Sequence, residues 1–339
     1  MPALSHMRLQ AFASSLMPMS KTRPDVRGSR SSSASTSERR PQPDFAFPAA
    51  AKLISGAPIS KNLNYYTYFL LGENGEVGGL EDTWVILHDA PLKGLGIQVG
   101  QFQIMDVVFP RELRLTRQDY LVYTVPLSDS GFDLTYQRGI NVSYAVKNVG
   151  LLVGVVNGNG IGGGHEGQGY PGRTPVIFDN DLAKVGYAHL AFESTYLNFG
   201  WFGLKGAEGR QADANRMWRT GPDAELMLGR LRVFAQFLTG VDDNPHFSLR
   251  KQNPDQLRLS GGFVGATLIL TDRWVLAGLY NRVVSDKHPL DASIVTAGGS
   301  YYWRRNFKLG IEGSYDLQGE HPTHPFPEHT VTAFLDFAY

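Results

Sequence analysis

The feature that most constrains this chain is a period-two alternation of apolar and polar residues that runs from about Leu63 to the C-terminus. In residues 307–317, aliphatic and aromatic side chains hold the odd positions except 313, and Lys308, Glu312 and Asp316 stand at even positions. Successive side chains of a β-strand point to opposite faces. The pattern therefore predicts strands with one apolar and one polar face rather than helices.

The connectors between the predicted strands alternate between short and long. About fourteen strands are expected, roughly at 63–71, 80–88, 95–104, 138–147, 150–157, 185–193, 196–205, 223–229, 231–240, 258–270, 273–284, 292–304, 307–317 and 329–339. A barrel that crosses an outer membrane has tight turns on the periplasmic side and long loops outside. A water-soluble sandwich gives no reason for long loops at one end only, and it needs a dry interior.

Composition excludes several other classes of protein. The 339 residues contain no Cys, which excludes disulfides, thiolate zinc sites and c-type haem attachment. Lys plus Arg equals Asp plus Glu at 32 each, so charge gives no reason to expect a nucleic acid partner. No apolar run approaches the ~18 residues of a membrane helix. We therefore expect an all-β, antiparallel up-and-down transmembrane barrel of 14–16 strands, in contact with outer-membrane lipid.

Residues 1–60 differ in composition from the rest. They hold 8 Lys or Arg and 3 Asp or Glu, and they include the run RGSRSSSASTSERRPQP. Such a segment cannot bury enough apolar surface to fold alone, so a disordered leader at 1–60 and a barrel at 61–339 are predicted. No clear export signal precedes the barrel. A misplaced start codon or a frameshift would explain the leader.

Aromatic residues lie in or beside many of the predicted strands, as the two interfacial girdles of a membrane barrel require. Phe337 and the terminal Tyr339 fall on one face of the last strand. A terminal aromatic residue of this kind resembles the signal by which bacterial outer-membrane barrels are passed to their insertion machinery. This machinery is therefore an expected partner.

Several stretches resemble one family of outer-membrane barrels. They are GLEDTWVILHDAPLKGLGIQVGQFQ, then FPRELRLTRQDY, QRGINVSYAV, LLVGVVNGNG and GPDAELMLGRLRVFAQFLTG. Together they are similar to the phosphate-selective porins of gram-negative bacteria. The resemblance implies a channel of sixteen strands, often trimeric. Two strands are then missing from the count, as if a first hairpin were lost or scrambled within 1–60. Phosphate selectivity is not carried over, because residues 61–339 are net acidic.

The best candidate for a channel constriction is the long connector at 104–131. It carries Arg111, Arg114 and Arg117, followed by Asp119. A loop of this length after an early strand commonly folds into a porin barrel, where guanidinium groups would filter anions. The alternative is a solvated loop whose arginines pair with Glu112 and Asp119.

Other charged residues of the predicted strands are candidates for the wall of the lumen. The cations are Arg138, Lys147, Arg232, Arg304 and Lys308, and the opposing carboxylates are Glu225, Glu312 and Asp316. This mixture predicts weak charge selectivity.

Signals for cofactors and catalysis are weak. GNGIGG at 158–163 matches a dinucleotide-binding pattern, but the Gly- and Pro-rich continuation predicts an outer loop rather than the required helix. His321, His324 and His329 lie in a Pro-rich stretch without the spacing of a known metal site, so an exposed loop is expected. No GxSxG or HExxH occurs. No catalytic residue, metal or cofactor is predicted.

The sequence thus favours a bacterial outer-membrane porin for passive diffusion of small hydrophilic solutes, with anions such as phosphate as candidates and a homotrimer as the expected assembly. One alternative is a barrel that sheathes a respiratory electron-transfer partner, with any haem motif upstream of Met1. A less favoured alternative is a barrel-embedded lipase.

Overall fold

The strands form one sheet that closes on itself. The computed structural model describes residues 8–16, 45–46, 49–73, 76–125, 130, 132–160, 179, 181–209, 214–248, 256–286, 290–318 and 329–338. The strands are β1 (Arg8–Leu16), β2 (Phe45–Ala46), β3 (Ala50–Pro58), β4 (Leu63–Glu73), β5 (Glu76–Val77), β6 (Leu80–His88), β7 (Leu95–Gln103), β8 (Tyr136–Val146), β9 (Val149–Val156), β10 (Val185–Phe192), β11 (Leu197–Glu208), β12 (Asn215–Leu228), β13 (Leu231–Asp242), β14 (Leu257–Ile269), β15 (Trp274–Ser285), β16 (Ala292–Arg304), β17 (Phe307–Asp316) and β18 (His329–Ala338).

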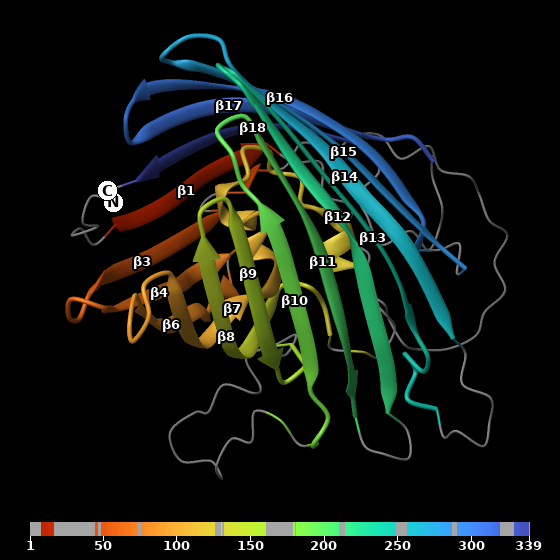
Figure 1. Cartoon of the computed structure of the whole chain (residues 1–339). Coiled ribbons are helices and arrows are strands. Elements are labelled where there is room, and N and C mark those ends of the chain that lie inside the picture. Colours follow the sequence, from red (N-terminus) through yellow and green to blue (C-terminus); the bar gives the residue numbers. More distant parts are fainter. Residues whose placement is uncertain are drawn as a thin grey trace, which may run out of the picture.

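Antiparallel pairing links consecutive long strands from β3 to β18, and β1 closes the barrel. β1 pairs with β18 on one side and with β3 on the other. Within the described ranges the sheet has eighteen strands; β2 and β5 are two residues long, and the remaining sixteen make up the barrel wall. The predicted antiparallel up-and-down barrel is confirmed. Strands β11 to β16 form a taller wall than β6 to β10 (Figure 1).

The two strands that the sequence count lacked lie before residue 61. β1 and β3 fall inside the segment that was expected to be a disordered leader, and both are paired in the sheet. The apolar residues of β3 are interrupted by small ones in AAKLISGAP, so its alternation is faint beside that of the later strands. The barrel of the structure thus includes residues on both sides of the predicted boundary at 60.

Each of the fourteen predicted strands is present, with one large difference in extent. β12 begins at Asn215, eight residues before the predicted start. Gly221 and Pro222 hid the first part of this strand, because both are depleted from strand interiors. Pairing with β13 skips these two residues, whereas Pro222 stays in register with Trp201 on β11.

Connectors differ between the two ends of the barrel as predicted. At one end, turns of two to six residues join the strands, and at the other the connectors have six or more. Short turns mark the periplasmic end of an outer-membrane barrel. Within the described residues, no helix is long and apolar enough to cross a membrane.

The outer face is apolar, as the alternation requires. On β17, Leu309, Ile311 and Tyr315 are 41%, 58% and 56% exposed, whereas Glu312 and Asp316, at positions of the other parity, are 6% and 1% exposed. The apolar side chains therefore point out of the barrel and the carboxylates point into it. Water-exposed apolar surface on this scale is unfavourable, which indicates contact with lipid.

The interior is not uniformly polar, which differs from the predicted polar lumen. A cluster of buried apolar side chains extends inside the barrel from the residues after β7 to the inward faces of β9 to β16. It includes Phe109, Leu121, Phe202, Phe263 and Ile294. The predicted strands at 150–157 and 273–284 were apolar on both sides for this reason. One wall of the barrel supports a segment that packs inside.

Candidate channel constriction

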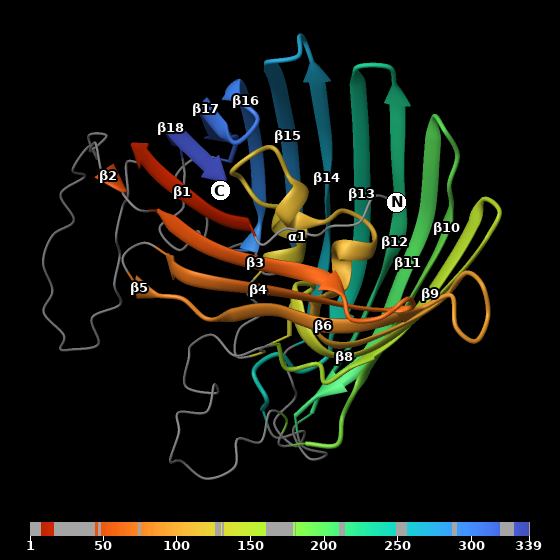
Figure 2. The same cartoon turned by 90° about the vertical axis from the view of Figure 1, so that its left-hand side faces the viewer.

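The segment that packs inside belongs to the connector between β7 and β8, and its described residues, 104–125, 130 and 132–135, are called here the inner loop. It contains the short helices η1 (Ile104–Val107), η2 (Arg111–Leu113) and α1 (Leu121–Thr124). The backbone N–H of Ile104 donates to the carbonyl of Thr135 at 3.0 Å and so closes the base of the loop. Figure 2 shows α1 within the barrel, between β3 and the wall formed by β13 to β15.

Aromatic stacking holds the inner loop against the wall. The rings of Tyr120 and Phe263 stack with centroids 4.1 Å apart and planes 16° apart. Phe109 contacts Phe234 and Phe263 at 5.3 and 5.5 Å between centroids. These rings are nearly excluded from solvent, with exposures of 2–7%. Their burial fixes the loop by the hydrophobic effect and by favourable ring geometry.

Polar side chains of the wall bind the loop backbone directly. Asn281 on β15 accepts from the N–H of Leu121 at 3.1 Å and donates to the carbonyl of Asp119 at 2.9 Å. The carboxylate of Glu312 on β17 accepts from the N–H groups of Arg117 and Gln118 at 2.7 and 3.0 Å. Asn281 and Glu312, called here the wall clamps, fix the height at which the loop crosses the lumen.

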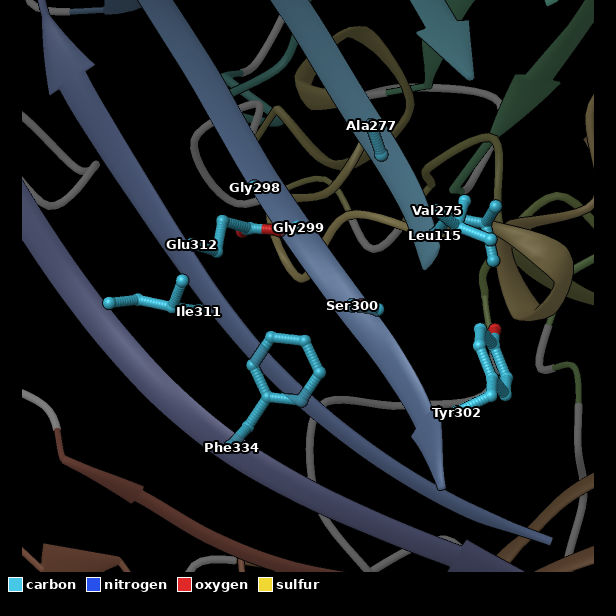
Figure 3. A pocket seen from close by; sticks show the side chains of 10 residues that line it. All are labelled: Leu115, Val275, Ala277, Gly298, Gly299, Ser300, Tyr302, Ile311, Glu312 and Phe334. Carbon is cyan, nitrogen blue, oxygen red and sulfur yellow. The ribbon is translucent and has the colours of Figure 1, made fainter. Parts of the chain in front are cut away.

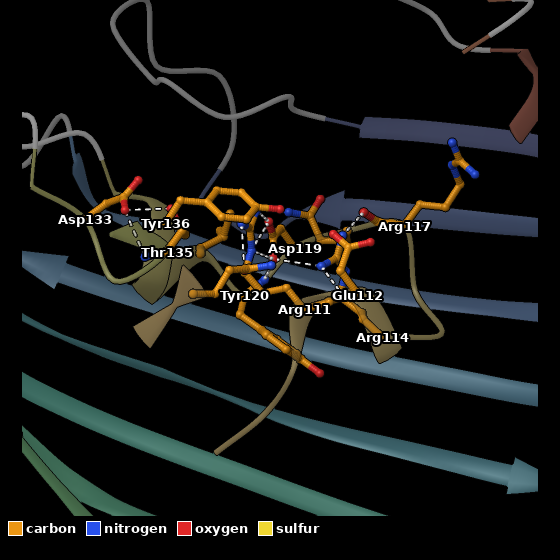
Figure 4. A network of polar contacts seen from close by, with 12 residues as sticks. Arg111, Glu112, Arg114, Arg117, Asp119, Tyr120, Asp133, Thr135 and Tyr136 are labelled. Carbon is orange, nitrogen blue, oxygen red and sulfur yellow. Dashed lines mark hydrogen bonds and ion pairs between the residues drawn. The ribbon is translucent and has the colours of Figure 1, made fainter. Parts of the chain in front are cut away.

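Two of the three arginines proposed for the filter are bound within the loop. Arg111 donates to both carboxylate oxygens of Asp119, and Arg114 donates to one of them at 3.0 Å (Figure 4). Arg114 also donates to the carbonyls of Arg111 and Thr116, each at 3.0 Å. Burial favours a higher pKa for Asp119, but Arg114 and Arg111 outweigh it and hold that pKa below its usual value. These arginines shape the loop.

Arg117 reaches the barrel wall instead. Its guanidinium lies 3.5 Å from the carboxylate of Asp336 on β18, whose other oxygen is 2.6 Å from the ammonium of Lys308 on β17. Both cations lie 5.2 Å from the ring centroid of Phe334. In this group, called the Arg117 cluster, two cations share the carboxylate of Asp336, and the carboxylate of Glu312 lies beside it on the backbone N–H of Arg117. Side-chain exposures of 25% for Arg117 and 20% for Lys308 leave both accessible from the lumen.

Of the remaining residues predicted for the wall of the lumen, some face the lumen and others do not. Arg232 and Glu225 pair inside the barrel, where Glu225 also accepts from Asn198 at 2.8 Å. Asp316 faces inward beside the end of β17 and accepts from the N–H of Gln318 at 2.9 Å. Arg232 is 42% exposed and its charge is balanced by Glu225.

Three cations predicted for the lumen wall lie elsewhere. Arg138 is two residues from the exposed Ile140, so strand alternation places it on the outer side of β8. Lys147 lies in the turn after β8 with φ 54°, and Arg304 is exposed at the end of β16. Alternation alone could not place Lys147 and Arg304, which lie at strand ends, whereas it already puts Arg138 on the face of Ile140 and Val142, so the lumen prediction for Arg138 was wrong. Of the proposed assembly signal, Phe337 faces outward at 38% exposure and Tyr339 lies outside the described residues.

A pocket lies where the inner loop meets β15 to β17, and Glu312 points into it (Figure 3). Gly298 and Ser300 on β16 have little or no side chain, and this leaves room for the pocket. The lining residues are Leu115, Val275, Ala277, Gly298, Gly299, Ser300, Tyr302, Ile311, Glu312 and Phe334. Glu312 is 6% exposed there, and its carboxylate is held by two backbone N–H groups of the inner loop.

The sequence did not identify the wall clamps as loop contacts. Glu312 was placed in the lumen wall but without a partner, and Asn281 was not singled out. The signal for Asn281 was an amide inside the otherwise apolar run WVLAGLYN, which is unfavourable to bury without hydrogen bonds. Nothing in the sequence indicated which backbone groups it would bind.

Asp106 in η1 makes the loop sensitive to pH. Burial, and then the charge of Glu112, raise the pKa of Asp106 to about 7. Folding therefore disfavours the charged form, so the contribution of Asp106 to stability is fully present below its ordinary pKa of ~4 and is lost as the pH rises towards 7.

The free energy of unfolding is measured by urea titration in detergent micelles at pH values from 4 to 8. We expect it to decrease less over this range in Asp106→Asn than in the wild type. The difference at pH 8 should be at most ~4 kcal/mol, at about 1.4 kcal/mol per pKa unit. Asp272→Asn, in an exposed turn, should keep the wild-type pH dependence. If the free energy of unfolding depends on pH in the same way in the wild type and in Asp106→Asn, this role for Asp106 is wrong.

The predicted nucleotide pattern and histidine cluster are partly outside the described residues. Gly158 and Gly160 lie just after β9, and Gln137 accepts from both of their N–H groups at 3.2 Å. His329 begins β18 and stacks on Tyr315, while His321 and His324 are not among the described residues. In the described ranges, no group of three or more His, Asp or Glu residues has the geometry of a metal site.

Comparison with known proteins identifies the fold. No protein-family model matches the chain, and no curated protein matches its sequence. Its structure is similar to the outer membrane channel DcaP of Acinetobacter baumannii, with a TM-score of 0.63, 12% identity, and coverage of 98% of this chain and 96% of that one.

Two further structures are similar over 98% of both chains. The anion-selective porin from Comamonas acidovorans has a TM-score of 0.64 and 9% identity. The trimer form of the outer membrane protein OmpT from Vibrio cholerae has a TM-score of 0.63 and 10% identity. The chain therefore has the fold of gram-negative outer-membrane porins.

Proposed function

We propose that this protein is an outer-membrane channel through which small hydrophilic solutes diffuse passively, with a preference for anions such as phosphate. The observation that carries the proposal is a closed barrel, apolar outside, whose inner loop is fixed across the lumen by the wall clamps. A fixed loop narrows a passage and sets a size limit. The proposal requires no cofactor and no covalent chemistry.

The swelling of liposomes that contain the refolded chain tests the proposal. Small sugars should enter at rates that fall steeply with their size, because a fixed constriction excludes by diameter. A barrel shown by boiling-dependent gel migration to be folded, yet impermeable to the smallest sugar, would contradict the proposal.

The anion preference rests on the Arg117 cluster. Arg111 and Arg114 are engaged with Asp119, whereas Arg117 and Lys308 are accessible from the lumen and share the single carboxylate of Asp336. One unit charge at ~4 Å in water is worth about 1 kcal/mol. The similarity of the fold to an anion-selective porin supports this assignment.

The variant Arg117→Gln/Lys308→Gln leaves Asp336 without its two cations and lowers the local charge by two units. We expect the ratio of anion to cation permeability to fall by roughly two- to fivefold, measured as a shift of reversal potential across a salt gradient. Arg258→Gln, on the outer side of β14, is the matched control and should leave the potential unchanged. An unchanged reversal potential in the double variant would show that the Arg117 cluster does not determine the anion preference.

We also propose a homotrimer, since one of the similar structures is a trimer. Light scattering of the refolded chain in detergent tests this assembly. The mass of the protein component should be three times that of one chain, and a monomer at all concentrations would contradict the proposal.

A further inference from the structure

The short turns carry a regular set of exposed cations. Among the described residues, seven turns join the strands at the periplasmic end, at 59–62, 89–94, 147–148, 193–196, 229–230, 270–273 and 305–306. Six of the seven contain a basic residue. These residues, called here the turn cations, are Lys61, Lys93, Lys147, Arg230, Arg273 and Arg305, and all six are exposed.

The charge of the turn cations is not balanced by neighbouring carboxylates. Within the described part of the chain, none of the six forms an ion pair, and the seven turns hold only three acidic residues, Asp89, Glu193 and Asp272. The contacts that two of them make are to neutral groups. Arg230 donates to the carbonyl of Leu270 at 2.9 Å, and Arg273 donates to the hydroxyl of Tyr301 at 3.2 Å.

Aromatic side chains place these cations at a definite depth. Trp274 directly follows Arg273, is 47% exposed on the outer face, and packs 4.9 Å from Tyr301. Trp303, two residues before Arg305, is 58% exposed and packs against Phe307. Exposed Trp and Tyr at strand ends occupy the boundary between hydrocarbon and headgroups. The turn cations lie just beyond this boundary, at headgroup level.

We propose that the turn cations bind the phosphate groups of anionic phospholipids in the periplasmic leaflet, so that a ring of these lipids surrounds the lower rim of the barrel. Long basic side chains reach from an interface to lipid phosphates while their apolar stems stay against the protein. An anionic membrane surface attracts each such cation. The inference rests on the proposed outer-membrane location and adds to it a lipid class and a leaflet.

Quenching of tryptophan fluorescence by brominated lipids tests the inference with the full chain in vesicles. Trp274 and Trp303 lie beside turn cations and report lipid contact there. We expect brominated phosphatidylglycerol to displace phosphatidylcholine from the barrel surface with a relative binding constant of ~3 to 5. In 1 M salt, where the Debye length is ~3 Å, this preference should fall to near one.

A variant with all six turn cations replaced by glutamine should show no preference between the two lipids. The matched control carries Arg216→Gln, Arg258→Gln and Arg282→Gln, which removes exposed cations near the opposite ends of the strands, and it should keep the preference. If the sixfold variant does not fold, the wild type in 1 M salt provides the test, because its preference for phosphatidylglycerol must then fall to near one.

The outcomes separate this inference from the proposed function. Vesicles that conduct ions but show no salt-sensitive preference for phosphatidylglycerol would overturn the lipid assignment alone. An equal loss of preference in the control variant would overturn the assignment to the periplasmic rim. A chain that forms no barrel in either lipid would overturn both proposals.

Discussion

A variant that carries Asn281→Ala and Glu312→Ala will conduct a larger and noisier current than the wild type. The two wall clamps make four hydrogen bonds to the inner loop, two of them to each side chain. At roughly 1 kcal/mol for each neutral bond and about 2 kcal/mol for each bond to the carboxylate, the anchoring is worth ~6 kcal/mol. A change of this size turns a rare detached state of the loop into a populated one.

Single-channel recording in planar bilayers measures this effect. The matched control is Thr296→Ala/Ser314→Ala, which removes a 2.8 Å hydrogen bond between inward-facing hydroxyls on β16 and β17 without touching the loop. The control should keep the steady wild-type current. If the clamp variant conducts as steadily as the wild type, the wall clamps do not position the loop.

The second large effect is expected at Phe263. This ring is 2% exposed and stacks on Tyr120, and Phe109 and Tyr123 pack edge-on against it. Phe263→Ala leaves a cavity between loop and wall, and such changes cost about 3–5 kcal/mol. We expect the midpoint of urea unfolding in detergent to fall accordingly.

Trypsin provides an independent readout for the same variant. Cleavage after Arg111, Arg114 or Arg117 requires the loop to leave the lumen, so these bonds should resist trypsin in the wild type and become sensitive in Phe263→Ala. Phe237→Ala is the control, since this ring lies on the neighbouring β13 but faces outward at 49% exposure. Equal resistance in both variants would show that the aromatic stack does not retain the loop.

The fold was predictable because lipid imposes a simple rule on every strand. Wherever the polar side of a strand faced the lumen, as with Lys308 and Glu312 on β17, period-two alternation identified the strand and its orientation. The rule weakened where the loop packs inside, since β9 and β15 are then apolar on both faces. It also failed at the N-terminus, where β3, which is rich in small residues, alternates only faintly.

The candidate site was predictable only in its local part. The sequence could pair Arg111 and Arg114 with Asp119, because the three lie within eight residues of one another. It could not pair Arg117 with Asp336 or with Glu312, whose carboxylate binds a backbone group 195 residues away. Such contacts depend on how far the loop descends into the barrel. Its aromatic packing sets that depth, and no sequence period encodes it.

We expect an open, water-filled passage to remain beside the inner loop despite the apolar cluster in the lumen. Planar-bilayer recording of the refolded wild-type chain tests it most directly, with folding verified by the shift in gel migration on boiling. We expect discrete current steps of uniform size that increase linearly with voltage. Folded barrels that insert into the bilayer without any current step would show instead that the loop seals the barrel.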